Sequence, residues 1–133
     1  MVGLHPRVPL NPSGLEVGYW APTPHAGRGY TTFAVQCLVL YAFDKLASTR
    51  VQVMCDEANT ASRRVIEKCG FAFEGVLRNL MVPATPELAA AGYELTGRFP
   101  MYALFPDTFD ALPWVEAVRA GMRYENLAGH PVE

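Results

Sequence analysis

The sequence has few of the residues that mark metal-binding or disulfide-rich proteins. It contains only three cysteines, Cys37, Cys55 and Cys69, and their spacing fits neither a CxxC metal pair nor a disulfide framework. The three histidines lie far apart in the chain, so no local metal cluster is supported. We therefore expect buried, reduced thiols and no bound metal.

Long apolar runs and blocks of charge are also missing. No run approaches the ~18 to 20 residues that span a bilayer, and the first residues lack the basic-then-apolar layout of a signal peptide. The 11 basic and 13 acidic side chains are spread along the chain and give a formal net charge of −2. These absences argue against a membrane or nucleic-acid partner. We expect a cytoplasmic protein that acts on a small molecule or a protein terminus.

Two common nucleotide-binding signatures are absent as well. There is no GxxxxGK[ST] segment, and no GxGxxG followed by an acidic residue about 20 positions later. Instead, an apolar run that begins at residue 16 breaks at Pro22 and Pro24, passes through a Gly-Arg-Gly turn at 27–29, and continues with helical spacing from Tyr30. This order predicts a strand, a glycine turn and a helix.

Such a turn suits a phosphate-bearing cofactor. The first N–H groups of a helix have no partners within the helix and point the same way, so they form an anion site that the helix dipole reinforces. Gly27 and Gly29 would let a phosphate oxygen approach the backbone, and Arg28 would add a positive charge at the rim. Two glycines can equally serve the geometry of the turn alone, and this alternative stays open.

The remaining pattern alternates strands and helices, and nothing in it requires two large domains. Strands are predicted at 2–8, 15–20, 50–55, 71–80 and 98–105, and helices at 30–46, 60–69 and 113–120, with one short helix in the excursion 83–97. Asn59 or Thr60 would cap the second helix, and Gly70 would end it. Pro100 should lie in an edge strand or at a strand's entry. We expect a domain at 1–109, followed by a C-terminal helix and tail at 110–133.

Four segments in a fixed order are more specific than any of them alone. They are EVGYW, GRGYTT, NTASRRVIEKCGFAFEGVLR and GRFPMYALFPDTF. Together they resemble the GCN5-related N-acetyltransferase (GNAT) superfamily over most of the chain, and most closely its RimJ/RimL-like branch of ribosomal-protein N-terminal acetyltransferases. The resemblance implies an α/β (α+β) fold with a mixed, strongly twisted sheet and helices on both faces. It also implies acetyl-coenzyme A as the cofactor.

In that family the cofactor lies in a wedge where two neighbouring parallel strands splay apart. The strands would be 15–21 and 50–55 here. Asn59 would hydrogen-bond the cofactor arm, and Ser62 would approach the sulfur. The resemblance implies backbone contacts to the pantetheine arm from Tyr19, Trp20 and Ala21, and to the pyrophosphate from Ala26, Gly27, Arg28, Gly29, Tyr30 and Thr31.

Acetyl transfer to an amine requires a base for the amine and an acid for the leaving thiolate. Glu16 is the first candidate base, because alternation places it on one strand face with Trp20. Asp56 and Glu57 are weaker candidates. The alternative for Glu16 is a solvated carboxylate at a strand end. The acceptor would be a protein N-terminus or a small amine.

The candidate acid is Ser62. Many relatives use a tyrosine from the second helix, but Ile66 stands at the matching position here. The alternative for both Asn59 and Ser62 is plain helix capping.

The resemblance also implies an opening strand and two helices that precede the first strand of this sequence. Helix 30–46 is apolar over most of its circumference and must be covered on more than one side. A homodimer would supply that cover, or the segment 113–120 would supply part of it. The alternative function is a non-catalytic module, left by truncation, that binds an acyl-coenzyme A or forms oligomers.

Overall fold

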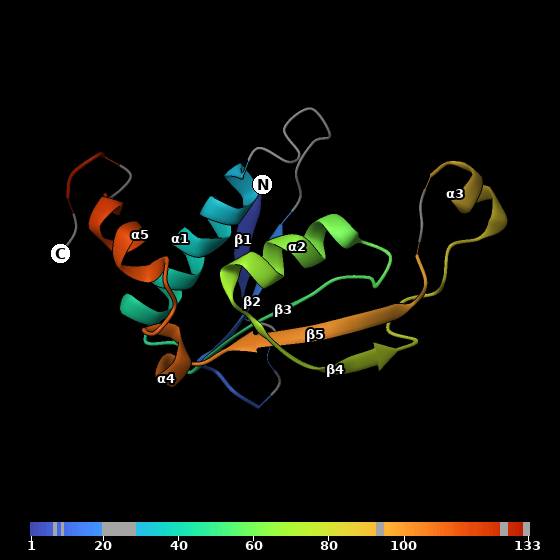
Figure 1. Ribbon diagram of the computed structural model, residues 1–133, viewed down its shortest axis with the longest axis horizontal. Helices are drawn as coiled ribbons and strands as arrows, with labels where there is room; N and C mark the ends of the chain where they lie inside the picture. Colours follow the sequence, from blue (N-terminus) through green and yellow to red (C-terminus); the bar gives the residue numbers. More distant parts are fainter. Residues whose placement is uncertain (7, 9, 20–28, 93–94, 126–127, 132–133) are drawn as a thin grey trace.

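The computed structural model describes residues 1–6, 8, 10–19, 29–92, 95–125 and 128–131 (Figure 1). The predicted strands and helices all appear, with their ends shifted by a few residues, and the short helix α4 is added. In chain order they are β1 (Val2–His5), β2 (Gly14–Tyr19), α1 (Tyr30–Asp44), β3 (Arg50–Met54), α2 (Thr60–Cys69), β4 (Ala72–Arg78), α3 (Pro86–Ala90), β5 (Arg98–Leu104), α4 (Pro106–Phe109) and α5 (Val115–Gly121).

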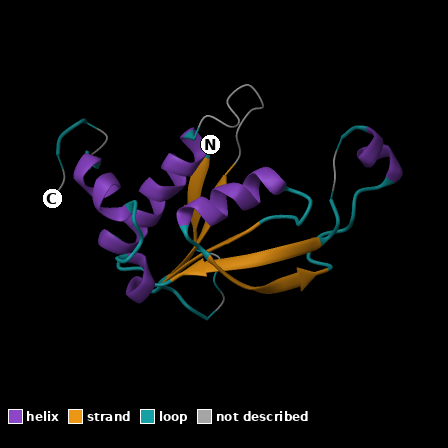
Figure 2. Cartoon of the chain, viewed as in Figure 1, coloured by secondary structure: helices purple, strands orange, loops and turns teal. Residues whose placement is uncertain are grey.

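The strands form one five-stranded mixed sheet in the order β1-β2-β3-β5-β4 (Figure 2). Strands β2 and β3 are parallel, and the long helix α1 makes the crossover between them. The other neighbouring strands are antiparallel. The parallel pair therefore lies inside the sheet, with an antiparallel partner on each outer side.

One face of the sheet carries the core. Helices α1, α2 and α5 all contribute to it, and α1 packs against both of the others. The sequence predicted helices on both faces, whereas these three helices share one face. Because side chains alternate along a strand, the residues of β2 and β3 that lie between the core residues point to the opposite face of the sheet. The buried helix residues that join the core include Val35, Val39, Leu40 and Ala42 of α1, Ile66 and Cys69 of α2, and Val115 and Val118 of α5.

Pro100 lies inside the sheet by strand order, because β5 runs between β3 and β4. The sequence predicted an edge position or a strand entry. Pairing of β5 with β3 begins only at Met101, so at Pro100 the sole strand neighbour is β4, with Val76 opposite. A residue without an N–H is tolerated where one side of the backbone needs no partner. The edge strands are β1 and β4, and the side chains of β4 are mostly exposed rather than half-buried as the sequence pattern suggested.

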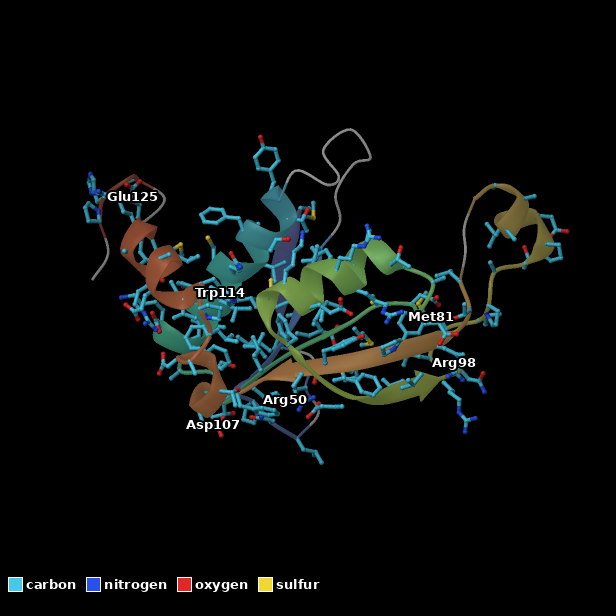
Figure 3. All side chains as sticks on the ribbon, viewed as in Figure 1. Arg50, Met81, Arg98, Asp107, Trp114 and Glu125 are labelled. Carbon is cyan, nitrogen blue, oxygen red and sulfur yellow. The ribbon has the colours of Figure 1, made fainter. Side chains whose placement is uncertain are left out.

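The C-terminal helix α5 covers α1 within the same chain. Arg119 of α5 donates two hydrogen bonds to the Asp44 carboxylate of α1, at 2.9 and 3.0 Å. Trp114, just before α5, donates from Nε1 to the carbonyl oxygen of Cys69 at 3.0 Å (Figure 3). The indole ring also packs edge-on against Phe109, with ring centroids 5.9 Å apart. Among the described residues, no helix is long and apolar enough to cross a membrane.

Trp114→Phe should lower the free energy of unfolding by about 1 to 2 kcal/mol, because it keeps an aromatic ring but removes the hydrogen bond to a partly buried carbonyl. Urea denaturation would measure the change. Tyr124→Phe is the matched control, since the buried Tyr124 hydroxyl has no hydrogen-bond partner among the described residues. Equal losses in the two variants would contradict a specific role for the indole N–H.

Candidate functional site

The parallel strands β2 and β3 part at their carboxyl ends. Strand β2 remains paired with β1 up to Tyr19, and β3 remains paired with β5 up to Met54. The gap therefore opens only between β2 and β3, and we call it the wedge (Figure 1). Backbone groups that face the wedge lack a strand partner and can bind an extended ligand. Before the wedge the two strands pair Gly14 with Arg50, Leu15 with Val51, and Glu16 with Gln52.

Helix α2 begins beside the end of β3, and Asn59 caps it. Its Oδ1 accepts a hydrogen bond from the Ser62 N–H at 3.0 Å, so the capping alternative describes part of what Asn59 does. The Nδ2 group of Asn59 makes no hydrogen bond to the described residues. Capping and ligand binding therefore use different atoms and are compatible.

Tyr19 links the two sides of the wedge. Its hydroxyl, at the end of β2, donates to the Ser62 carbonyl oxygen of α2 at 3.0 Å. Burial raises the pKa of Tyr19 to about 12, and a hydrogen bond with the Ser62 side chain lowers it by less. The hydroxyl therefore keeps its proton near neutral pH. Sequence reasoning used only the backbone of Tyr19, since no local pattern reveals a contact across 43 residues.

Helix α1 starts with the exposed N–H groups that an anion site requires. Gly29 is its N-cap, with φ 79°, and no side chain caps the helix. Glycine has a backbone reason to stand there, because other residues rarely adopt this left-handed conformation. A Cβ at Gly29 would meet nothing within 4 Å among the described residues. The expected contacts from Trp20, Ala21, Ala26, Gly27 and Arg28 lie outside the described residues.

Glu16 is buried, at 8 % exposure, so it is not the solvated strand-end carboxylate of the alternative interpretation. Its Oε2 accepts a hydrogen bond from Gln52 Nε2 at 3.0 Å. Because Tyr19 reaches α2 and alternate residues face opposite ways, Glu16 points to the sheet face away from α2 and Ser62. The structure thus places the candidate base and the candidate acid on opposite sides of the sheet, with the wedge between them.

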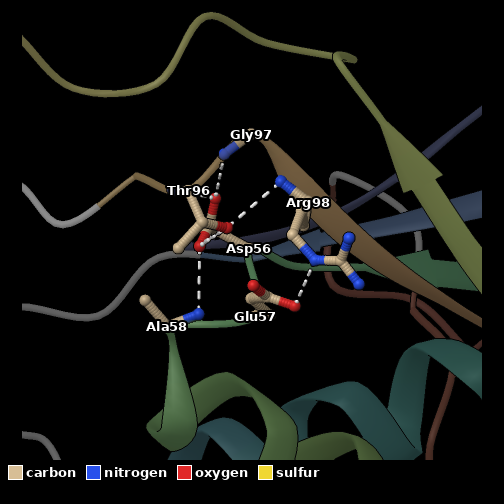
Figure 4. A network of polar contacts seen from close by, with 6 residues as sticks. All are labelled: Asp56, Glu57, Ala58, Thr96, Gly97 and Arg98. Carbon is tan, nitrogen blue, oxygen red and sulfur yellow. Dashed lines mark hydrogen bonds and ion pairs between the residues drawn. The ribbon is translucent and has the colours of Figure 1, made fainter.

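The weaker candidate bases have structural partners (Figure 4). Asp56 accepts hydrogen bonds from the N–H of Ala58, from the N–H and hydroxyl of Thr96, and from the N–H of Gly97, at 2.8 to 3.1 Å. Burial alone would raise the pKa of the Asp56 carboxyl, but these bonds together hold it below its usual value. Glu57 forms an exposed ion pair with Arg98 at 2.9 Å. Asp56 therefore has a structural role, because its hydrogen bonds connect the end of β3 with the residues that precede β5.

Other side chains in and next to α2 limit the reactions that the site can carry out. Ile66 is fully buried and carries no proton donor. Burial raises the pKa of the Cys55 thiol, and raises that of Cys69 to about 12, so neither is poised as a nucleophile. Arg63, next to Ser62, has a buried Nε–H with no hydrogen-bond partner among the described residues. The sequence alone gave no sign of this unpaired donor.

The fold and the wedge together define an α/β protein that can take an extended ligand between two parting strands, with a helix N-terminus for an anionic group. The family model for the acetyltransferase (GNAT) domain matches residues 1–72, which is more than half of the chain. The chain therefore belongs to the GNAT acetyltransferase family, as the sequence segments predicted.

Curated relatives agree with this assignment. The chain is 37% identical over 79 residues to the Bacillus subtilis protein named "Putative ribosomal N-acetyltransferase YdaF", a match that covers 59% of this chain and 43% of the relative. It is 33% identical over 70 residues to the ribosomal-protein-serine acetyltransferase of Escherichia coli, covering 53% of this chain and 38% of the relative. These relatives support the RimJ/RimL-like branch. The matches span less than half the length of either relative.

A solved structure supports the fold. The GCN5-related N-acetyltransferase from Brucella melitensis superposes with a TM-score of 0.66 and 27% sequence identity. The superposition covers 98% of this chain and 55% of that one. The predicted mixed α/β architecture is confirmed.

Proposed function

We propose that the protein transfers an acetyl group from acetyl-coenzyme A to a primary amine. The observation that carries the proposal is the wedge between β2 and β3, in a chain that belongs to the GNAT family. The names of the curated relatives favour the N-terminal amine of a protein as acceptor, with a small amine as the alternative. A ribosomal-protein acceptor would place the reaction in the cytoplasm.

The residues present fit the cofactor. The backbone at Tyr19 would pair with the pantetheine arm, and the uncapped N–H groups at Gly29, Tyr30 and Thr31 would hold the pyrophosphate. The free Nδ2 of Asn59 would donate to a carbonyl of the arm. The partnerless Nε–H of Arg63 is a further donor in the same first turn of α2. When bound, acetyl-coenzyme A supplies the acetyl group as a thioester.

The side chains would then divide the proton transfers. Glu16 would accept a proton from the acceptor amine on one face of the sheet. Ser62 would donate a proton to the leaving sulfur from the other face, directly or through a water. A backbone N–H at the end of β2 would polarise the carbonyl.

Thiol release from acetyl-coenzyme A, measured with a panel of N-terminal peptides and small amines, tests the proposal. We expect release that depends on an amine and on the native fold. Peptide turnover without small-amine turnover would assign a protein acceptor. Coenzyme A binding without turnover of any amine would overturn the proposal and favour the alternative of a non-catalytic acyl-coenzyme A-binding module.

Gly29→Val should weaken coenzyme A binding by about tenfold or more, because a branched side chain would stand where the pyrophosphate approaches the backbone. Calorimetry would measure the affinity. Gly92→Val is the matched control, since Gly92 also has a positive φ and an open space at Cβ but lies in the excursion around α3. Equal affinities of the two folded variants would show that the pyrophosphate does not bind at this turn.

We also predict a homodimer. Helix α5 covers part of α1 within one chain, yet Tyr30 and Phe33 of α1 remain exposed, as do Met81 and Val82 after β4. Exposed apolar surface favours association at about 25 cal/mol per Å². Light scattering at micromolar concentrations would measure the mass. A monomer with no concentration dependence would contradict this prediction.

A further inference from the structure

A chain of hydrogen bonds crosses the sheet on the face away from the helices. Gln52 Nε2 donates to Glu16 Oε2 at 3.0 Å, and Arg50 Nε donates to Gln52 Oε1 at 2.9 Å. Arg50 in turn donates from Nη1 to Glu74 Oε1 at 3.0 Å and from Nη2 to the other carboxylate oxygen. The chain thus connects β2, β3 and the edge strand β4.

This arrangement leaves the Gln52 amide only one orientation. The guanidinium of Arg50 can only donate, so the oxygen of the Gln52 amide must face it. The amide nitrogen is thereby turned to Glu16, whose carboxylate accepts. Arg50 is itself held by its two bonds to Glu74 and by the Phe105 ring, whose centroid lies 5.6 Å from the guanidinium carbon. The donor to Glu16 is therefore fixed in advance.

The hydrogen bond between Gln52 and Glu16 stands at the apex of the wedge. These two residues form the last matched pair of β2 and β3 before the strands part. Both are buried, Gln52 at 6 % and Glu16 at 8 % exposure. Burying a polar pair costs more than burying an apolar pair of similar shape, so sheet stability alone does not explain it. Oε1 of Glu16 accepts no hydrogen bond from the described residues.

We propose that Gln52 is a positioning residue for the acceptor reaction, a role that rests on the proposed function. Gln52 holds Oε2 of Glu16 and leaves Oε1 to receive the proton of the acceptor amine. The nitrogen lone pair forms the new C–N bond to the acetyl carbon as the C–S bond breaks. The proton from nitrogen passes to Oε1 of Glu16, and the sulfur leaves as a thiolate that takes a proton from Ser62 or water.

Among the described residues, three titratable groups are linked to Glu16 by strand pairing or through Gln52. His5 of β1 is its direct partner in the antiparallel register, Arg50 approaches through Gln52 from β3, and Glu74 neutralises Arg50 from β4. A substitution at Gln52 leaves all three of these groups in the protein. A loss of acceptor turnover in such a variant would therefore report the lost donor rather than a lost charge.

Gln52→Met tests the proposal, because methionine is of similar length and has no donor. We expect kcat/KM for the acceptor to fall about tenfold or more, because the Glu16 carboxylate would no longer be held in place to receive the proton. The affinity for coenzyme A, measured by calorimetry, should stay unchanged. Gln36→Met on α1 is the matched control.

A second variant keeps the inference testable if Gln52→Met does not fold. Arg50→Met leaves Gln52 in place but frees its amide to rotate, and should lower kcat/KM for the acceptor by a smaller factor, with the affinity for coenzyme A again unchanged. An active wild type, together with an unaltered kcat/KM for the acceptor in Gln52→Met, overturns the inference while the acetyltransferase function stands. Equal losses of acceptor turnover and coenzyme A affinity would also overturn the inference, because they would show that Gln52 has a structural role instead. A wild type that turns over no amine overturns the proposed function and the inference with it.

Discussion

Replacing Asp56 by alanine should lower the free energy of unfolding by about 3 kcal/mol. The Asp56 carboxylate is buried and accepts four hydrogen bonds, from Ala58, Thr96 and Gly97. Its removal would leave the N–H groups of Thr96 and Gly97 without their acceptor, and each unpaired buried group costs about 1 to 3 kcal/mol. Urea denaturation at neutral pH would measure the loss.

The same carboxylate should make stability depend on pH. The pKa of Asp56 is lowered in the folded protein, because its hydrogen bonds outweigh the effect of burial. Its contribution is therefore complete above the unfolded value of about 3.9, and it is lost as the pH falls through the lower folded value. The difference in stability between the wild type and Asp56→Asn should be constant near neutral pH and shrink in acid.

Glu57→Gln is the matched control for Asp56. Glu57 is the next residue, but its ion pair with Arg98 is largely exposed, and such pairs contribute about 0 to 1 kcal/mol. A similar loss in both variants would mean that Asp56 does not join β3 and β5 as the structure indicates.

Ser62→Ala should lower kcat by about 10² to 10⁴ if Ser62 is the sole acid for the leaving thiolate, with little change in the affinity for coenzyme A. Ser62 lies in the first turn of α2, and the buried Ile66 cannot donate a proton. Steady-state kinetics with an active acceptor, together with calorimetry, would separate the two effects.

Thr60→Ala is the control for Ser62, since it removes a hydroxyl from the exposed start of the same helix. We expect it to leave kcat within a small factor of the wild type. An unaltered kcat in Ser62→Ala, with the chemical step shown to be rate-limiting, would assign the proton to water or to the acceptor. The acceptor-side inference at Gln52 would stand in that case, because it concerns the other face of the sheet.

The sequence by itself determined the features that depend on neighbouring residues. Asn59 caps α2 and Gly70 ends it with φ 83°, while Thr85 caps α3 with Pro86 at its first position. The open start of α1 at Gly29 is equally local. These features could be predicted because a cap, a turn or a helix start is stabilised by atoms a few residues apart. The ordered set of such segments was enough to predict the family.

Only the tertiary structure decided which side chains meet across the sheet. Glu16 and Gln52 are 36 residues apart, Asp56 and Thr96 are 40 apart, and Tyr19 and Ser62 are 43 apart. Their contacts depend on strand order, on the register of β2 against β3, and on which face each strand turns to the helices. A pattern of residue types along one strand indicates which residues share a face, but it does not say which strands become neighbours or which residues stand opposite each other, because those depend on burial of the whole core. Alternation could therefore place Glu16 on a strand face, but only the paired strands made it buried, bound to Gln52, and located at the apex of the wedge.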